Sequence, residues 1–383
     1  MKTSLNDKQL TLHFEGEINS LTSASIEADV NETLKDKDFS SLVLDFEKVN
    51  YVSSAGLRII LKLKQKYSDV KIINVSLEVY DVLQMTGFTN IMEVSKALRF
   101  VDLKGATPIG AGFTARVYRI NKDTIVKVFK DGYNIEGIEH ELNLAKQAFI
   151  LGIPTAISYD IVKVNDNRLG VVFEMLDCES LRDAFVNSPN RYDELIDKYV
   201  KLLLKINSTE PMDANLPDAK QQWREKVEAI KDYFEPAQYK KLKELIETIP
   251  EKNTFVHGDC HFKNIMIQGD DLYLIDMDTL SKGHHIFELA ALYCPYIAFE
   301  EDDPGNNEKF LGVSAELSRK VCNDIIEKYF NKKDEDIVNK IRIACYTHMV
   351  WWYVKNASKD DPRINSCKAR LLTLVDKYND LVI

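Results

Sequence analysis

Residues 257–266 read HGDCHFKNIM and place two histidines, an aspartate, a cysteine, a lysine and an asparagine within eight positions. A metal site, a nucleophile and a phosphate-transfer loop are the three kinds of site that such a segment could form. Asp259 and Asn264 lie five positions apart, and Asp276 follows a short strand-turn-strand pattern. Carboxylate and amide oxygens are ligands that Mg²⁺ prefers. Asn264 and Asp276 could hold metal ions that bridge nucleotide phosphates, while Asp259 orients or deprotonates an acceptor hydroxyl.

Two further segments carry residues suited to binding phosphates. Gly110-Ala111-Gly112 lies between apolar segments, where a turn between strands is expected. Glycine lets a backbone approach a ligand closely, so Gly110 and Gly112 are candidates for a loop that covers phosphates. Lys127 lies in the segment IVKVF among apolar neighbours, and we expect its ammonium group either to face solvent or to bind phosphate.

A helix is predicted over residues 136–150, and one of its glutamates is a candidate partner for Lys127. The apolar stripe of this helix consists of Ile138, Leu142, Ala145 and Phe149. Glu141 lies at the border of the stripe and is expected to pair with Lys127, with Glu139 as the competitor for that role.

The order of these motifs resembles the kinase fold, in the version found in aminoglycoside phosphotransferases and choline kinases. The motifs are GxGxxxxV, VKVF, a helix glutamate, HGDxHxxN and IDxD, and they cover about residues 104–300. The resemblance implies an ATP-dependent kinase with Mg²⁺ as a cofactor. It also implies that Asp259 is the catalytic base and that Asn264 and Asp276 bind Mg²⁺.

The same resemblance assigns the nucleotide-binding residues. Lys127 would contact the α- and β-phosphates of ATP. Glu174 and Met175, in the stretch GVVFEML, would turn backbone groups toward the adenine. His257 would be a buried, hydrogen-bonded member of the catalytic loop.

Three positions depart from the family pattern. Ala115 replaces the third glycine of the phosphate loop, and Asp278 occupies the position of the DFG glycine. A later pattern, usually GDxxxDLA, reads GHHIFELA here, with Glu288 in the acidic position. Nucleotide binding is still expected despite these departures. They indicate that the part of the site that binds the phosphate acceptor is particular to this chain.

Zinc binding and nucleophilic catalysis are the alternatives for the opening segment. His257, Cys260 and His261 lie close together, and His284 with His285 could complete a zinc site. Zinc normally takes four protein ligands, or three with an open position, and the usual paired cysteines are missing. Cys260 beside His261 could form a nucleophile, but neither alternative explains the other motifs.

The first 100 residues show a different pattern of predicted secondary structure. Short strands are predicted over residues 10–14, 42–46 and 70–75, and short helices over 54–67 and 77–85, with Ser76 as a cap. This alternation predicts a small α/β domain at residues 1–100. The following domain, residues 104–383, is predicted to be α+β and bilobal. Its first lobe would span about residues 104–178, and its largely helical second lobe about residues 179–383.

The segment LVLDFEKVNYVSSAGLRIIL resembles the STAS domain of anti-sigma factor antagonists, and MTGFTNIMEV extends the likeness over about residues 5–98. The phosphorylated serine of that family matches Ser54. The family aspartate before it is Ser53 here, and the residue after it is Ala55. The resemblance implies a regulatory domain with a protein partner and a possible phosphosite at Ser54, whereas the plain interpretation is a serine that caps a helix.

Composition limits the remaining possibilities. The chain has 383 residues and a formal net charge of -10, which gives no sign of the basic surface that nucleic acid requires. Its start lacks an apolar secretory core, and no run approaches about 18 uninterrupted apolar residues, so we expect no membrane span. The six scattered cysteines are then most simply reduced thiols in the cytoplasm.

The sequence therefore favours an ATP-dependent phosphotransferase acting on the hydroxyl of a small molecule, coupled to a regulatory STAS domain. The alternative is a signalling protein in which the kinase-like domain phosphorylates or regulates a STAS domain. Aminoglycoside resistance is a third hypothesis. The acceptor pocket could be lined by aromatic residues of the helical region, which otherwise belong to its core; these are Trp223, Trp351, Trp352 and Tyr353.

Overall fold

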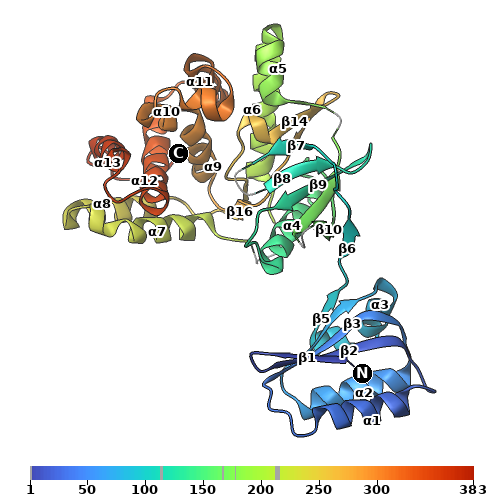
Figure 1. Cartoon of the computed structure of the whole chain (residues 1–383). Helices are drawn as coiled ribbons and strands as arrows, with labels where there is room; N and C mark the ends of the chain where they lie inside the picture. Colours follow the sequence, from blue (N-terminus) through green and yellow to red (C-terminus); the bar gives the residue numbers. More distant parts are fainter. Residues whose placement is uncertain (1, 113–114, 166–167, 177, 212–215) are drawn as a thin grey trace. The chain divides into compact units, whose positions relative to one another are not determined.

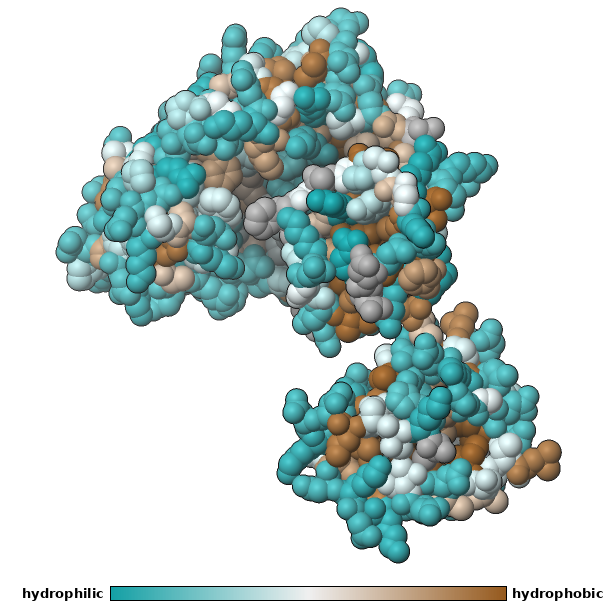
Figure 2. All heavy atoms as spheres, in the orientation of Figure 1, coloured by the Kyte–Doolittle hydropathy of each residue, from teal (hydrophilic) through white to brown (hydrophobic). Residues whose placement is uncertain are grey.

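The computed structural model describes residues 2–112, 115–165, 168–176, 178–211 and 216–383. The chain divides into two compact units, Met1–Asp102 and Leu103–Ile383 (Figure 1). Hydrophilic side chains cover most of the face of each unit that Figure 2 shows. Among the described residues, none of the helices combines the length and the apolar character that a bilayer crossing needs.

The first unit is built on one sheet with the strand order β1-β2-β3-β4-β5, in which β1 is antiparallel to β2 and the other pairs are parallel. All residues of β3 from Leu42 to Phe46 are buried, so both faces of the sheet are covered. Helices α1 and α2 lie side by side, and α3 packs on β3 (Figure 1). The elements are β1 (Lys2–Asn6), β2 (Gln9–Ile18), α1 (Ser23–Leu34), β3 (Ser41–Val52), α2 (Ser54–Lys66), β4 (Val70–Val75), α3 (Leu77–Met85), β5 (Glu93–Lys96) and β6 (Arg99–Val101).

The two serines before α2 have different roles. Ser53 is the N-cap, because its side chain accepts a hydrogen bond from the Ala55 N–H at 3.2 Å. Ser54 is the first helical residue, and its side chain is exposed. A Cβ at Gly56 would lie 2.7 Å from the Ile18 carbonyl oxygen, so only glycine lets α2 approach the end of β2 this closely.

The second unit begins with an antiparallel sheet in which neighbouring strands follow the order β10-β11-β9-β8-β7. Helix α4 packs against β10 and β11. Its buried stripe runs from Ile138 and Leu142 through Ala145 to Ala148, so the prediction that Phe149 continues the stripe is wrong, and Phe149 is 47% exposed. The elements are β7 (Pro108–Ala111), β8 (Ala115–Arg119), β9 (Thr124–Phe129), α4 (Ile135–Ile150), β10 (Ser158–Val164) and β11 (Leu169–Glu174).

The rest of the unit is mostly helical, with α12 packed against α7, α9 and α13. A short antiparallel hairpin, β14–β15, interrupts the helices and follows the HGDCHFKN segment. The elements are β12 (Glu179–Ser180), α5 (Leu181–Asn187), α6 (Tyr192–Ser208), α7 (Ala219–Ala229), α8 (Pro236–Glu247), β13 (Phe255–Val256), η5 (Phe262–Asn264), β14 (Ile265–Gln268), β15 (Asp271–Leu274), β16 (Ser281–Lys282), α9 (His285–Tyr293), η6 (Cys294–Ala298), α10 (Phe299–Asp302), η7 (Asn307–Leu311), α11 (Ala315–Phe330), α12 (Glu335–Asn356) and α13 (Pro362–Val375).

Candidate active site

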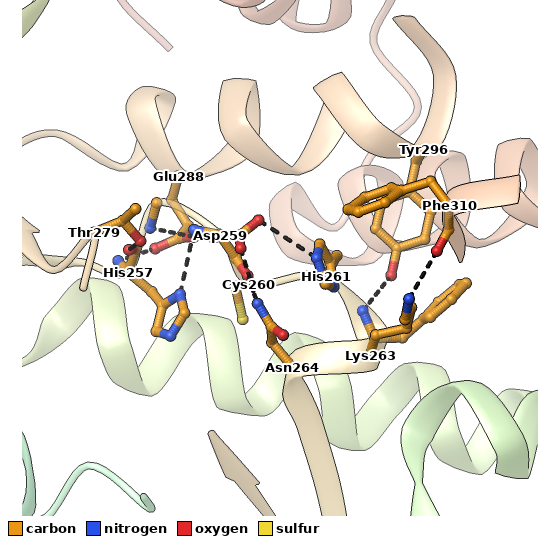
Figure 3. Close-up of polar contacts among 12 residues, drawn as sticks. His257, Asp259, Cys260, His261, Lys263, Asn264, Thr279, Glu288, Tyr296 and Phe310 are labelled. Atoms are coloured by element: carbon orange, nitrogen blue, oxygen red, sulfur yellow. Dashed lines mark hydrogen bonds and ion pairs between the residues drawn. The ribbon is translucent and has the colours of Figure 1, made fainter. Parts of the chain in front are cut away.

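The loop between β13 and η5 carries Asp259, and the β14–β15 hairpin brings Asp276 back beside it. Asn264 ends η5, and its side-chain amide donates to the Asp259 carbonyl at 3.0 Å and to the Asp259 carboxylate at 2.9 Å (Figure 3). The Ile275 N–H donates to the Asn264 carbonyl at 2.9 Å, which joins the two segments. The structure therefore brings the three predicted residues of this loop pair together.

Glu288, on α9, holds the backbone of the loop through hydrogen bonds. Its carboxylate accepts the N–H groups of His257 at 2.5 Å and of Gly258 at 3.3 Å, and its side chain is fully buried (Figure 3). Burial raises the pKa of Glu288 to about 7, while the two backbone donors act in the opposite direction. The sequence marked this residue only as an acidic position, and nothing in the sequence names its partners.

His257 is a structural member of the loop. It is fully buried, and burial lowers its pKa to about 4, so the ring is neutral at physiological pH. Its Nδ1 accepts a hydrogen bond from the Asp259 N–H at 3.2 Å, and its carbonyl accepts one from the Thr279 hydroxyl at 2.6 Å. The ring and carbonyl of His257 thus fix the backbone on both sides of Gly258.

Cys260 and His261 have packing roles, which removes the support for zinc or a thiol nucleophile. Cys260 is fully buried, burial raises the pKa of its thiol, and its carbonyl accepts the Tyr199 hydroxyl. His261 lies with Nε2 3.5 Å from the Asp259 carboxylate, and burial lowers its pKa to about 4. In the described part of the chain, no three His, Cys, Asp or Glu side chains gather as a metal-binding group.

Lys127 joins three elements through two short ion pairs. Its Nζ lies 2.7 Å from the Glu141 carboxylate on α4 and 2.8 Å from the Asp276 carboxylate after β15. Only 12% of the Lys127 side chain is exposed. Burial alone would lower the pKa of Lys127, but Asp276 and Glu141 together raise it above its ordinary value. Glu141, and not the exposed Glu139, is therefore the partner of this lysine.

Carboxylates crowd around Asp259. The Asp259 side chain is 40% exposed, and its carboxylate accepts the Asn264 amide at 2.9 Å. Burial, followed by repulsion from Asp276 and Asp278, raises the pKa of Asp259 to about 8. Burial and repulsion from Asp276 likewise raise the pKa of Asp278 to about 6. The sequence reasoning noted Asp278 only as a departure from the family pattern; its place two residues after Asp276 was the available signal.

The donor set suits a hard divalent cation. Because the Asn264 amide nitrogen faces Asp259, its oxygen points away from Asp259 and remains an acceptor (Figure 3). Asp276 and Asp278 add carboxylate oxygens whose mutual repulsion a cation would relieve. Mg²⁺ is usually held by one or two carboxylates together with substrate phosphates, so these residues fit it without a complete cage of protein ligands.

The predicted phosphate loop lies at the turn between β7 and β8, where residues 113 and 114 are outside the described chain. The Gly112 N–H donates to the Ala115 carbonyl at 2.8 Å. A Cβ at Gly110 or Gly112 would meet protein atoms no closer than 3.6 Å. Packing against the described residues therefore does not require glycine at either position.

The predicted adenine-facing residues are the last residue of β11, Glu174, and Met175, which follows it. The Glu174 N–H donates to the Ile157 carbonyl, and the Met175 N–H donates to the Asp123 carbonyl, both at 2.8 Å. Both N–H groups are thus engaged within the protein. A contact from these residues to a nucleobase would have to come from their carbonyl oxygens.

The aromatic residues of the helical region divide between core and surface. Trp223 is buried and donates through Nε1 to the Ala344 carbonyl at 3.1 Å. Tyr353 is buried as well, with its hydroxyl donating to Asp302 at 3.1 Å. Both are core residues in this fold, whereas Trp352 is 37% exposed.

Comparison with known proteins identifies both units. A model of the phosphotransferase enzyme family matches residues 105–312, more than half of the chain. The chain belongs to the phosphotransferase enzyme family. A model of the STAS domain matches residues 1–100, so this family member carries an N-terminal STAS domain, and both predicted resemblances are confirmed. The predicted fold classes, an α/β domain followed by a kinase-like fold with a helical C-terminal region, are confirmed too.

One curated relative covers the STAS domain. It is the "Putative anti-sigma factor antagonist BtrV" of Bordetella bronchiseptica, 30% identical over 95 residues, which are 24% of this chain and 81% of the relative. This relative is similar to the first unit alone.

Solved structures similar to the phosphotransferase-family unit have low sequence identity. A choline/ethanolamine kinase family protein from Mesorhizobium loti is 13% identical, with a TM-score of 0.46, and covers 71% of this chain and 92% of its own. The ternary complex of streptomycin, ATP and APH(2″)-IIa is 13% identical, with a TM-score of 0.46, and covers 78% and 97%. The aminoglycoside phosphotransferase APH(4)-Ia is 11% identical, with a TM-score of 0.49, and covers 71% and 93%.

The raised pKa of Asp259 predicts a stability cost that depends on pH. The folded-state pKa of about 8 lies above the ordinary value of 3.8, so the folded state loses stability as pH rises between these values. Asp259→Asn removes the titrating group. Thermal unfolding should therefore give a higher Tm for this variant than for the parent at pH 8, with the difference vanishing near pH 4.

Asp232→Asn is the matched control, because Asp232 is exposed in the same unit. Its Tm should differ from that of the parent by the same small amount at both pH values. An Asp259→Asn variant no more stable than the parent at pH 8 would contradict the crowding of carboxylates described here.

Proposed function

We propose that this chain transfers the γ-phosphoryl group of ATP to a hydroxyl of a small molecule. The observation that carries the proposal is Lys127, which bridges Glu141 and Asp276 beside the Asp259–Asn264 pair. A buried lysine that two carboxylates from different elements hold in place is suited to contacting the phosphates of a nucleotide. A lysine that only faced solvent would need neither carboxylate.

The roles of the residues follow from their chemistry. The acceptor hydroxyl oxygen attacks the γ-phosphorus, the bond from that phosphorus to the β–γ bridging oxygen breaks, and ADP leaves. The hydroxyl proton passes to the Asp259 carboxylate. Asn264 and Asp276 would hold Mg²⁺, with Asp278 close by, and the metal would supply charge neutralisation for the phosphates. Lys127 would contact the α- and β-phosphates.

The remaining nucleotide contacts come from backbone. Gly110 and Gly112 would cover the phosphates, since neither glycine is required by internal packing. Carbonyl oxygens of Glu174 and Met175 would accept from the adenine amino group, because their N–H groups are already bonded. Within this proposal residues 1–100 are the regulatory STAS domain, about 104–178 the first kinase lobe and about 179–383 the second. ATP as the phosphoryl donor, together with cysteines kept as reduced thiols, suits a reaction in the cytoplasm.

Aminoglycosides, which are polycations, are a less suitable acceptor. Such an acceptor needs free carboxylates, and the acidic run of α10 is used internally. Glu300 accepts the N–H groups of Gly305 and Asn307. Glu301 accepts the Tyr346 hydroxyl, and Asp302 pairs with Arg370.

Replacing Lys127 tests the proposed nucleotide site. Lys127→Met keeps the length of the side chain but removes the cation for the phosphates. We expect a loss of ATP-dependent turnover on the order of 10²–10³-fold, the usual effect of removing one charge-stabilising donor, in an ADP-release assay over alcohols, amino alcohols, sugars and aminoglycosides. Lys122→Met, at an exposed lysine, is the control and should leave turnover unchanged.

Two results would contradict the proposed function. One is the absence of Mg·ATP binding to the unmodified chain at millimolar nucleotide. The other is equal turnover in the Lys127→Met variant and the parent.

A second candidate function is signalling through Ser54, and the exposure of this serine favours it. Ser53 performs the capping, so the Ser54 hydroxyl is free at the first residue of α2, where a phosphate would meet helix N–H groups. If this chain phosphorylates its own STAS domain, labelled ATP should label the peptide that contains Ser54. Ser54→Ala and Asp259→Asn should abolish the label, and Ser53→Ala should retain it. Turnover of a metabolite with no label at Ser54 would exclude self-phosphorylation.

A further inference from the structure

A basic hollow of about 300 Å³ lies beside the catalytic loop. The start of α5, the residues around Lys263 and the segment η7 form its walls. Its charged lining residues are Arg182, Lys263 and Lys309, against the single carboxylate of Asp183. A cluster of three cations is notable because the chain as a whole carries a formal net charge of -10.

The three cations differ in how far they are already neutralised. Arg182 is paired with Asp183 and also donates to the Gly312 carbonyl at 2.8 Å. Lys309 lies 3.6 Å from the Asp303 carboxylate. Lys263 donates to the Phe310 carbonyl at 2.8 Å, and within the described residues its ammonium group has no carboxylate at ion-pair distance. The hollow therefore has cationic charge that the protein itself does not balance.

The hollow is connected to the catalytic aspartate through a short line of side chains. His261 lies with Nε2 3.5 Å from the Asp259 carboxylate, and its ring meets the edge of the Phe310 ring at 5.3 Å between centroids. Phe310 lines the hollow and is 42% exposed, and the Lys263 ammonium group lies 5.3 Å from its ring centroid. Figure 3 shows Asp259, His261 and Lys263 in succession along the loop, with Phe310 of η7 beside Lys263.

Arg182 packs closely against Gly312, a left-handed backbone position that favours glycine. Gly312 has a φ of 72°, and a Cβ there would lie 2.5 Å from the Arg182 Nη2. The guanidinium group can therefore sit directly against the carbonyl of residue 312. Beyond its contacts with Asp183 and Gly312, the guanidinium group has further N–H donors, and its planar geometry suits a carboxylate or phosphate.

We infer that this hollow binds an anionic group of the acceptor, a phosphate or carboxylate on the small molecule whose hydroxyl takes the phosphoryl group. The inference rests on the proposed function, since it names the class of acceptor for that same site. Lys263 and Arg182 would hold the anion, Phe310 would cover the carbon skeleton, and the hydroxyl would lie toward Asp259.

Matched acceptors test this inference. Glycerol, glycerate and glycerol 3-phosphate share a three-carbon hydroxyl skeleton, as glucose, gluconate and glucose 6-phosphate share a six-carbon one. With Mg·ATP and the full chain, ADP release should favour the anionic members of each set over the neutral parent by about tenfold or more in kcat/KM, the effect of one charged hydrogen bond. The ratio between carboxylate and phosphate members identifies which anion is bound.

Charge-removing variants locate the effect. Lys263→Gln together with Lys309→Gln should raise KM for the anionic acceptors about tenfold or more, with a smaller change in kcat. KM for ATP should stay unchanged. Lys332→Gln, at a lysine on the surface after α11, is the matched control and should change neither constant.

The outcomes separate this inference from the proposed function. If Mg·ATP stabilises the chain but neutral or cationic acceptors are preferred, or the double variant leaves anionic KM unchanged, the inference is overturned and the phosphotransferase stands. If no acceptor is turned over, thermal shift of the Mg·ADP-saturated chain with glycerol 3-phosphate decides. The inference is overturned if glycerol 3-phosphate raises the Tm no more than sodium chloride does at equal ionic strength. If the ADP-release assay shows higher turnover with an acidic serine-containing peptide than with the anionic small molecules, the inference that the acceptor is a small molecule is overturned.

Discussion

Repulsion among carboxylates is the constraint on which this active site depends. Asp259, Asp276 and Asp278 gather beside one another, and burial, followed by repulsion among these carboxylates, raises the pKa values of Asp259 and Asp278. Such an arrangement is unfavourable in the empty protein unless cations compensate for it. Lys127 supplies one cation by pairing with Asp276. Mg²⁺ bound with a nucleotide would relieve the remaining repulsion. The electrostatic free energy released in this way would then contribute to the binding free energy of the metal and the nucleotide.

The scaffold keeps these carboxylates together by fixing the backbone from the buried side. Glu288 accepts two N–H groups of the loop, and the neutral His257 ring accepts a third from Asp259 itself. Buried polar groups of this kind are costly unless each is paired, so the network favours a single loop conformation. Asp259 can then remain partly exposed and keep its raised pKa, because the fixed backbone prevents its side chain from moving away from Asp276.

Sequence reasoning recovered the parts of the site that lie within motifs. The spacing of Asp259, Asn264 and Asp276 was sufficient to predict their meeting. The helical period made Glu141 the expected partner of Lys127 but left Glu139 as a competitor. Sequence reasoning failed where the deciding contact comes from a distant element. The two N–H groups that Glu288 accepts, the engaged N–H of Met175 and the exposure of Phe149 each depend on packing that no local pattern records. The basic hollow likewise combines residues 180–183, 263 and 309–312, which only the fold brings together.

Proton release on nucleotide binding tests the central claim most directly. Isothermal titration of the full chain with a non-hydrolysable ATP analogue at pH 7 and saturating Mg²⁺, in two buffers of different ionisation enthalpy, measures it. If the metal relieves the repulsion, the pKa values of Asp259 and Asp278 fall and binding releases protons, with a smaller release in Asp259→Asn. Binding without net proton release, or release unchanged in Asp259→Asn, would contradict the account.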